Sequence, residues 1–306
     1  MAVTAQMVKE LRTLTSAGMM DCKKALVETN GDMEEAVKYL REKGLAKAAK
    51  KAGRVASEGI STLLISEDGK KGVVLEVNSE TDFVAKNDDF IGFAKAVAKL
   101  IVDGDIATME QLKAAPFGES GESVEETLQA LIGKIGENMS LRRFETLTVE
   151  NGSVSGYVHG NGKMSVIMAV ETTAPAADYA EMAKDICMQI AAMNPKFVGK
   201  DDVDQAYLDE EREVLMQQAL NEGKPQAIVE KMVVGRLNKS LKEVCLLEQV
   251  FVKDSDLTVG KLVANKAKEL GADLKITAFK RFEVGEGIEK KEEDFASEVA
   301  STIANK

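Results

Sequence analysis

The chain has few of the residues on which catalytic and metal sites usually depend. Its 306 residues include one histidine, His159, three cysteines and no tryptophan. Cys22, Cys187 and Cys245 are far apart and form no CxxC pair, so neither a disulfide framework nor a zinc site is indicated. We expect each cysteine to pack as a small apolar side chain, and we expect no metal and no cofactor.

Long apolar runs are also missing. No run approaches the roughly 20 residues that span a bilayer, and Met1–Thr4 leads into polar helical sequence rather than a signal peptide. We therefore expect a cytoplasmic protein with no membrane partner. Acidic residues outnumber basic ones 51 to 40, which disfavours non-specific binding of DNA or RNA, because phosphate contacts need clustered lysine and arginine.

The common catalytic motifs are absent as well. Residues 156–164 superficially resemble a phosphate-binding loop, but their glycine spacing is wrong and Met164 stands where Ser or Thr is required. The segment lies between two predicted strands, where a hairpin turn explains it. There is no GxSxG, no HExxH and no GxGxxG after a strand. His159 is better explained as a surface or interface residue than as a catalytic base, so we predict a protein that acts on another protein.

The N-terminal part, residues 4–42, is predicted to form three short helices. Thr4 is a suitable N-cap for the first helix, which Ser16-Ala17-Gly18 interrupts. Asn30-Gly31-Asp32 supplies a glycine that ends the second helix and an acid that begins the third. The arrangement looks like a ubiquitin-associated-type bundle, and we predict a first unit of residues 1–55 that includes a linker.

The linker, residues 43–58, is basic. Lysine and arginine alternate with alanine, and no acid occurs between Lys43 and Ser57. One interpretation is a solvated helical linker, and the other is a basic contact for an acidic or RNA surface. Both remain open at this point.

The rest of the chain is predicted to hold two copies of one α/β subdomain, residues 56–150 and 151–285, which gives an α+β fold with small antiparallel sheets. In each copy two strands joined by a tight turn precede a helix. The predicted strands are Ile60–Ile65 and Val73–Val77 in the first copy and Val154–His159 and Ser165–Val170 in the second; the predicted helices are Phe90–Ile101 and Tyr179–Met193. We align Arg143-Phe144-Glu145 with Arg281-Phe282-Glu283 as the ends of the two copies.

The copies differ where the second strand meets the helix. Thirteen positions separate Val77 from Phe90, but nine separate Val170 from Tyr179, so the first copy has about four extra residues there. Glu80–Val84 falls in this interval, and loops on a rigid scaffold often carry function. Within it Phe83 either acts as an exposed apolar wedge or folds back into the core, as an isolated Phe usually does.

The second copy contains a large insertion. Residues 202–243 are predicted to form a helical hairpin with its turn at Gly223-Lys224-Pro225, and a projecting helix pair is a natural interaction arm. Residues 286–306 follow as a C-terminal helical module with Phe295, Val299 and Ile303 on one face. This module either caps the core or contacts a partner.

Two long motifs resemble a known family. Leu11–Leu26 and Glu76–Lys86 are similar to the two signatures of the bacterial translation elongation factor Ts family. Shorter matches follow in order along essentially the whole chain: Lys134–Asn138, Gly223–Pro225, Glu230–Val233 and Arg281–Gly287. Ser16 departs from the first signature, which usually has Gly or a polar residue such as Asp or Gln, and we expect no consequence.

The resemblance implies a guanine nucleotide exchange factor for elongation factor Tu that performs no covalent chemistry. It implies that the loop of Thr81, Asp82, Phe83 and Val84 acts near the nucleotide and magnesium site, promotes GDP release and stays bound until GTP enters. Contacts with the partner are implied for Met19, Met20, Lys23, His159 and Val233. It also makes a homodimer through the helical hairpin possible.

Two other functions fit parts of the sequence. Residues 4–42 also suit an adaptor of the ubiquitin-binding type, whose core would be dispensable for binding. The basic linker also suits an RNA- or ribosome-associated protein without exchange activity, whose binding would collapse with added salt.

Overall fold

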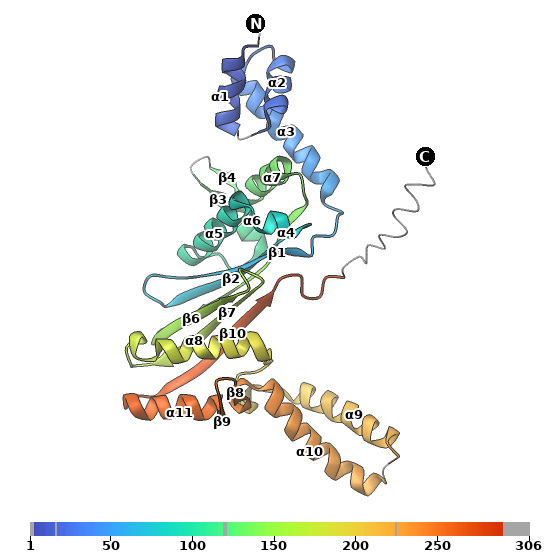
Figure 1. Cartoon of the computed structure of the whole chain (residues 1–306), viewed down its shortest axis with the longest axis vertical. Coiled ribbons are helices and arrows are strands. Elements are labelled where there is room, and N and C mark those ends of the chain that lie inside the picture. The colour runs from blue at the N-terminus through green and yellow to red at the C-terminus, as the bar shows by residue number, and fades with distance from the viewer. Residues whose placement is uncertain (1–2, 16, 119–120, 224, 290–306) are drawn as a thin grey trace.

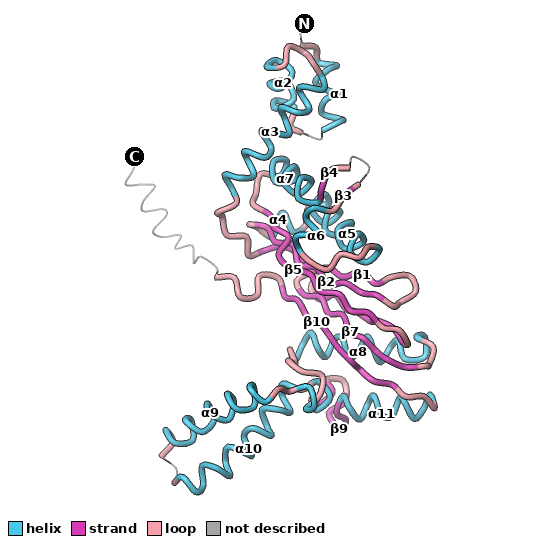
Figure 2. The backbone as a smooth tube through the Cα atoms, turned by 180° about the vertical axis from the view of Figure 1, so that it is seen from behind, coloured by secondary structure: helices cyan, strands magenta, loops and turns pink. Residues whose placement is uncertain are grey.

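The computed structural model describes residues 3–15, 17–118, 121–223 and 225–289. It is an α+β structure, in which helices surround small antiparallel sheets (Figures 1 and 2). Within these residues no helix combines the length and the apolar character needed to cross a membrane. Most of the predicted C-terminal helix, residues 290–306, lies outside the described residues.

Three helices form the N-terminal module, which lies at one end of the molecule (Figure 1). They are α1 (Ala5–Thr15), α2 (Met19–Glu28) and α3 (Met33–Lys51). The Thr4 hydroxyl accepts a hydrogen bond from the Met7 amide at 3.2 Å, and the Asp32 carboxylate caps α3 by accepting from the Glu35 amide at 3.0 Å. The three predicted helices are confirmed, while the likeness to a ubiquitin-associated bundle stays a prediction.

Helix α3 continues through most of the predicted basic linker. It ends at Lys51, so residues 43–51 are helical, and only residues 52–57 connect it to the first strand. Alanine between the charged positions explains this continuation, because it has the highest helix propensity. The predicted unit boundary at residue 55 falls in the short connection.

The first copy contains a three-stranded antiparallel sheet of order β1-β2-β5. Its elements are β1 (Glu58–Ile65), β2 (Lys71–Ser79), α4 (Asp82–Ala85), α5 (Asp88–Asp103), α6 (Met109–Ala114), β3 (Pro116–Phe117), β4 (Glu122–Ser123), α7 (Val124–Ile135) and β5 (Met139–Thr148). The turn between β1 and β2 needs the left-handed conformation of Gly69, whose φ is 70°.

The second copy repeats this topology with the order β10-β7-β6. Its elements are β6 (Gly152–His159), β7 (Met164–Thr172), α8 (Ala176–Met193), the 3-10 turn η1 (Lys200–Asp202), α9 (Gln205–Asn221), α10 (Gln226–Val244), the 3-10 turn η2 (Leu246–Glu248), β8 (Val250–Phe251), β9 (Asp254–Thr258), α11 (Val259–Leu270) and β10 (Leu274–Glu283). In both copies the second strand is central and the last strand pairs on its other side.

The two sheets pack face to face between two layers of helices (Figures 1 and 2). Along β2, Val73, Leu75 and Val77 face α5 and α7, while Val74 joins a separate apolar cluster between the sheets. Along β7, Ile167 and Ala169 join the same cluster. Both central strands are therefore buried on both faces, which explains their nearly continuous apolar sequences.

One predicted correspondence between the copies is wrong. Strand register pairs Leu75 with Phe144 in the first copy and the equivalent Met168 with Phe279 in the second. Phe144 therefore corresponds to Phe279 and not to Phe282. The two Arg-Phe-Glu triplets are offset by three residues, because similar letters near the strand ends do not determine how the strands pair.

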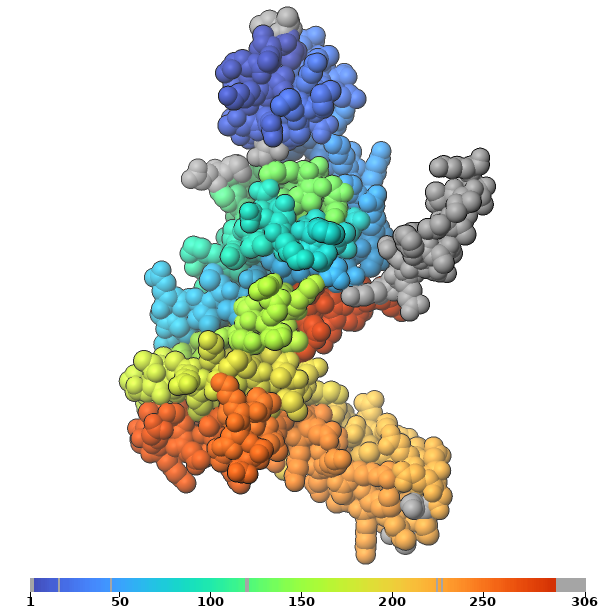
Figure 3. Space-filling model, viewed as in Figure 1, coloured from blue at the N-terminus to red at the C-terminus, as the bar shows by residue number. Residues whose placement is uncertain are grey.

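The predicted hairpin consists of α9 and α10, which project from the body at the end opposite the N-terminal module (Figure 3). Ala219, Val229 and Val233 are buried where the two arms pack. Among the described residues of the hairpin, the large apolar side chains that remain exposed are Val214, Leu220, Ile228 and Val234. Pairing of two copies through this hairpin stays a prediction.

Candidate functional site

The extra residues of the first copy form a single helical turn, α4, between β2 and α5. Phe83 is 79 % exposed on this turn, whereas its neighbours Val84 and Ala85 are buried in the core. Successive side chains of a helix point about 100° apart, so the residues that anchor the turn direct Phe83 away from the core. The interpretation that Phe83 folds back into the core is therefore wrong.

Asp82 is ionised and paired on the same turn. Its carboxylate lies 2.7 Å from the Lys86 ammonium, one helical turn later. The hydrogen bond from Lys86 lowers the pKa of Asp82 below its ordinary value, and the charge of Lys163 adds to this effect. The α4 turn thus presents a carboxylate beside an exposed aromatic ring.

Thr81, at the start of the turn, is held by side chains from elsewhere in the first copy. Its amide and its hydroxyl both donate to the Glu137 carboxylate, at 3.0 and 2.8 Å. Its carbonyl accepts a hydrogen bond from the Ser79 hydroxyl at 2.9 Å. The backbone that carries Phe83 therefore begins from a fixed position.

His159 ends strand β6 and is exposed, with its Nδ1 atom 3.0 Å from the Tyr157 hydroxyl. The turn that follows contains Lys163, whose ammonium lies 2.6 Å from the Glu58 carboxylate at the start of β1. Glu58 pairs across the sheet with Ser79, the last residue of β2 before the α4 turn. The structure thus brings the turn after His159 to the same end of the sheets as the α4 turn.

The predicted contacts of the N-terminal module lie on α2. Met19 is 58 % exposed, Met20 is 73 % exposed, and Lys23 is exposed one turn further along. Leu14 and Val27 are also exposed, so the module carries several apolar side chains at its surface. These residues and α4 belong to different parts of the molecule (Figure 1), so any site that uses both is an extended surface rather than a pocket.

Val233 is the predicted residue that the structure separates from the others. It is 3 % exposed between the arms of the hairpin, whereas the next residue, Val234, is 58 % exposed. In this arrangement the Val233 side chain holds α10 against α9. It offers no surface to a partner while the hairpin remains closed.

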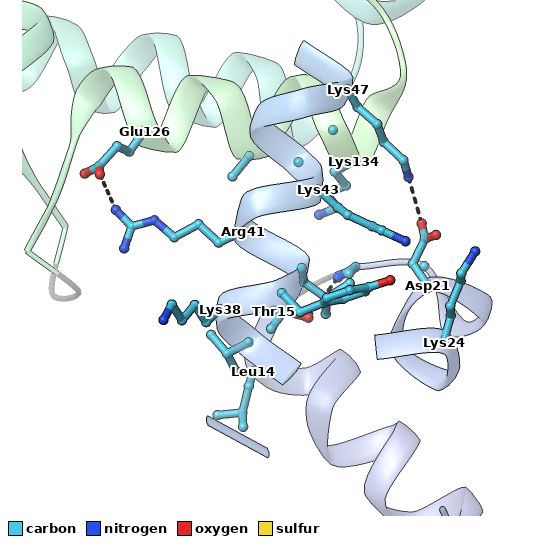
Figure 4. A pocket seen from close by; sticks show the side chains of 18 of the residues that line it. Leu14, Thr15, Asp21, Lys24, Lys38, Arg41, Lys43, Lys47, Glu126 and Lys134 are labelled. Atoms are coloured by element: carbon cyan, nitrogen blue, oxygen red, sulfur yellow. Dashed lines mark hydrogen bonds and ion pairs between the residues drawn. The ribbon is translucent and has the colours of Figure 1, made fainter. Parts of the chain in front are cut away.

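A groove of about 580 Å³ lies between the N-terminal module and α7 (Figure 4). Its residues include Leu14, Asp21 and Lys134, and none belongs to the α4 turn. Ion pairs between residues of this groove join Arg41 to Glu126 and Glu122, and Lys47 to Asp21 at 3.1 Å. The groove therefore marks where the module rests on the core.

Most of the basic linker residues contact other parts of the same chain. Lys51 donates to the Gly136 carbonyl, and Arg54 lies 3.5 Å from the Glu80 carboxylate. Lys43 lies over the Tyr39 ring, with its ammonium 4.4 Å from the ring centroid, and its hydrogen bond to Tyr39 raises the Lys43 pKa. These contacts favour a structural role for the linker over a contact with nucleic acid.

The three cysteines and the acidic side chains of the described residues are dispersed rather than clustered. These residues contain no cluster of three or more His, Cys, Asp or Glu side chains that could hold a metal ion. Cys22, Cys187 and Cys245 are all buried, as predicted, and burial raises the pKa of the Cys187 thiol to about 12. That thiol stays protonated near neutral pH, where it is a poor nucleophile.

The sequence did not indicate the residues that hold the α4 turn. Glu80 and Glu137 both lie in motifs that resemble the family signatures, but neither has a spacing that predicts contact. They are 57 positions apart in sequence. Only the pairing of β2 with β5 brings them together.

Comparisons with known proteins agree with one another. The family model described as Elongation factor TS matches residues 80–286. A relative from Clostridium perfringens (strain SM101 / Type A), called Elongation factor Ts, is 58 % identical over 298 residues, which cover 97 % of this chain and 98 % of the relative. A relative of the same name from Clostridium novyi (strain NT) is 55 % identical over 305 residues, which cover 99 % of this chain and all of the relative.

Proposed function

The chain belongs to the elongation factor Ts family of translation elongation factors, and from this premise we propose that it releases GDP from elongation factor Tu by inserting Phe83 near the nucleotide. The exposure of Phe83 carries this proposal. At 79 %, Phe83 is the most exposed large apolar side chain among the described residues, and it lies on a turn that is anchored on both sides. The protein acts as an exchange factor and catalyses no covalent reaction.

The mechanism follows from linkage between two bound partners. A GTPase holds GDP through backbone amides of its phosphate loop and a magnesium ion. An exchange factor that binds the nucleotide-free GTPase more tightly than the GDP-bound form must lower the affinity of the GTPase for GDP by the same factor. Burial of a Phe side chain contributes about 1.5–3 kcal/mol. Since about 1.4 kcal/mol corresponds to a factor of ten, Phe83 alone can lower the affinity for GDP by about tenfold to a hundredfold.

Asp82 has a secondary role in the proposal. Its carboxylate is ionised in the free protein and lies beside the exposed ring of Phe83. On binding it displaces the segments of the GTPase that position the magnesium ion. Thr81 and Val84 complete the loop by fixing its two ends, one through hydrogen bonds and the other through burial.

The other predicted contacts hold the loop against the partner. Met19, Met20 and Lys23 on α2 bind the nucleotide-binding domain of the GTPase, and His159 contacts its third domain. Val233 contributes by keeping the hairpin closed, since it is buried between the arms. Met19, Met20, Lys23 and His159 together supply contact area that a single turn of helix cannot.

The test is the rate of GDP release from elongation factor Tu in a stopped-flow assay at saturating concentrations of this protein. Phe83→Ala is expected to slow release about tenfold to a hundredfold, because the apolar area that it buries on the partner is lost. Met193→Ala is the control, since Met193 is a large exposed apolar residue at the end of α8. Release at the wild-type rate by Phe83→Ala would overturn the proposal.

A further inference from the structure

Two acidic side chains form a reciprocal clasp beside the α4 turn. Glu137 accepts hydrogen bonds from the amide and the hydroxyl of Thr81, at 3.0 and 2.8 Å. In return, Glu80 accepts a hydrogen bond from the backbone amide of Asn138. Residues 80–81 and 137–138 thus hold each other through carboxylate-to-backbone bonds, which are stronger than bonds between neutral groups.

The clasp leaves Thr81 little freedom. Its amide and hydroxyl are bound by Glu137, and its carbonyl is bound by Ser79. On the other side of Phe83, Val84 and Ala85 are buried in the core. The exposed ring is therefore carried by a segment with a polar anchor before it and an apolar anchor after it.

Residues 136–138, which follow α7, also contact the end of the N-terminal module. Lys51 donates to the carbonyl of Gly136, which ends α7 in the left-handed conformation with a φ of 93°. The Asn138 amide group donates to the Arg54 carbonyl at 2.7 Å, and the Arg54 guanidinium lies 3.5 Å from Glu80. Residues 136–138 therefore join the α4 turn to the helix that carries the N-terminal module.

We propose that Glu137 is a positioning residue for nucleotide exchange, which orders the Phe83 turn before the partner binds and couples it to the end of α3. This inference rests on the proposed function. A loop that must become ordered on binding loses part of its interaction energy. An anchor present in the free protein avoids this cost, so more of the binding free energy of Phe83 is available to weaken GDP binding. Glu137 does not touch the partner in this account.

A purely structural role predicts different results. Glu137 is half-buried at the surface and bonds to Thr81, so its loss leaves the apolar core of the first copy intact. A structural role would therefore show itself as a lower melting temperature with no specific change in the maximal rate. A positioning role lowers the maximal rate of GDP release at saturation even at a temperature where the variant is fully folded.

The experiment measures maximal GDP release and thermal unfolding for Glu137→Ala, Thr81→Val and the double variant. Glu137→Ala is expected to slow release about tenfold, since it removes two hydrogen bonds to a charged acceptor. Thr81→Val removes one of them and slows release less. The double variant is expected to be no slower than Glu137→Ala, because both changes remove the same interaction.

Two further variants complete the test. Glu137→Gln keeps one acceptor oxygen and is expected to recover part of the rate, while Glu150→Ala, at an exposed acid in a turn, is expected to match the wild type. A normal maximal rate for Glu137→Ala beside a slow Phe83→Ala would overturn the positioning role alone. Normal rates for both would instead overturn the proposed function, and additive effects in the double variant would contradict the clasp.

Discussion

At the scale of single residues, Phe83 and Glu76 occupy environments opposite to those their side chains usually prefer. Phe83 is exposed on α4, and Glu76 is completely buried on β2 between the two sheets. The exposed ring of Phe83 is accessible to a partner, as the proposed function requires. A buried carboxylate requires compensation, because an unpaired charge in the interior is costly.

Glu76 receives this compensation from both copies. Arg142 and Arg143 of the first copy donate at 2.8 and 2.6 Å, and the amide of Gly285, after the last strand of the second copy, donates at 2.8 Å. Burial by itself raises the Glu76 pKa, but these hydrogen bonds and one from Asn78 outweigh it, so the pKa lies below its ordinary value of 4.5. Glu76 therefore ties the two copies together as a carboxylate.

We predict that Glu76→Gln destabilises the protein by about 2 kcal/mol or more at pH 7, because two guanidinium groups lose the buried carboxylate that lies between them. A depressed folded-state pKa stabilises the fold above pH 4.5, and this stabilisation is lost as the pH falls through the folded-state pKa. The difference in unfolding free energy between the wild type and the variant should thus shrink at acid pH. Urea unfolding at pH 7 and pH 3 measures it.

Glu145→Gln is the matched control for this prediction. Glu145 lies on β5, the strand next to β2, and pairs with Lys280 at 3.2 Å, but both side chains are exposed to solvent. Its replacement is expected to cost less than about 1 kcal/mol at either pH. A difference for Glu76→Gln that stays constant between pH 7 and pH 3 would show that the charge of Glu76 does not tie the copies together.

The sequence alone could not decide either environment. An isolated Phe usually lies in a core, and only the family resemblance favoured an exposed Phe83. Glu76 interrupts an apolar strand, but its partners Arg142 and Arg143 are more than sixty positions away. Both residues depend on tertiary contacts that no local pattern encodes.

At the scale of elements, the crossing of α3 and α7 positions the N-terminal module. The helices approach closely at two glycines, since a Cβ added to Gly133 would lie 3.3 Å from the Cα of Gly44. Larger residues at such a crossing push helices apart or force strained side-chain conformations. The ion pair between Arg41 and Glu126 lies along the same contact.

We predict that Gly133→Leu lowers the unfolding free energy by about 1–3 kcal/mol, because the leucine side chain does not fit between the crossing helices. Gly92→Leu on α5 is the matched control. Gly92 is exposed and a Cβ added there meets no atom within 4 Å, so the higher helix propensity of leucine should stabilise α5 slightly. Equal unfolding midpoints in urea for the two variants would refute a tight crossing.

Periodicity predicted most of the elements near this crossing and in the two sheets. The structure confirms the predicted strands at residues 60–65, 73–77, 154–159 and 165–170. They were predictable because alternation and turn residues are local signals. The extension of α3 through the basic residues was one of two open interpretations. The strand sequences did not predict that the Arg-Phe-Glu triplets of β5 and β10 are offset by three residues. This offset depends on pairing across each sheet.

At the scale of the whole molecule, the fold separates the surfaces that the proposed function uses. The N-terminal module and the hairpin lie at opposite ends of the molecule, and the four-layered core lies between them (Figures 1 and 3). The α4 turn and the turn after His159 belong to different copies but lie at the same end of the sheets, since Lys163 pairs with Glu58 and Glu58 lies opposite Ser79 at the end of β2. A partner that contacts all these surfaces must extend along the molecule.

This arrangement assigns different energetic roles to the surfaces. Contacts made equally with the GDP-bound and the nucleotide-free GTPase raise affinity and leave the affinity for GDP unchanged. Only a contact that differs between the two forms promotes release. In this account α2 and the turn after His159 supply the common contacts, and Phe83 supplies the difference.

The most direct test is the ratio of the affinities of this protein for nucleotide-free and GDP-bound elongation factor Tu, measured by calorimetry for the wild type and Phe83→Ala. Phe83→Ala is expected to lower this ratio by about tenfold or more, mainly by weakening the complex with the nucleotide-free form. An unchanged ratio, with both affinities reduced equally or not at all, would contradict the central claim that Phe83 drives GDP release.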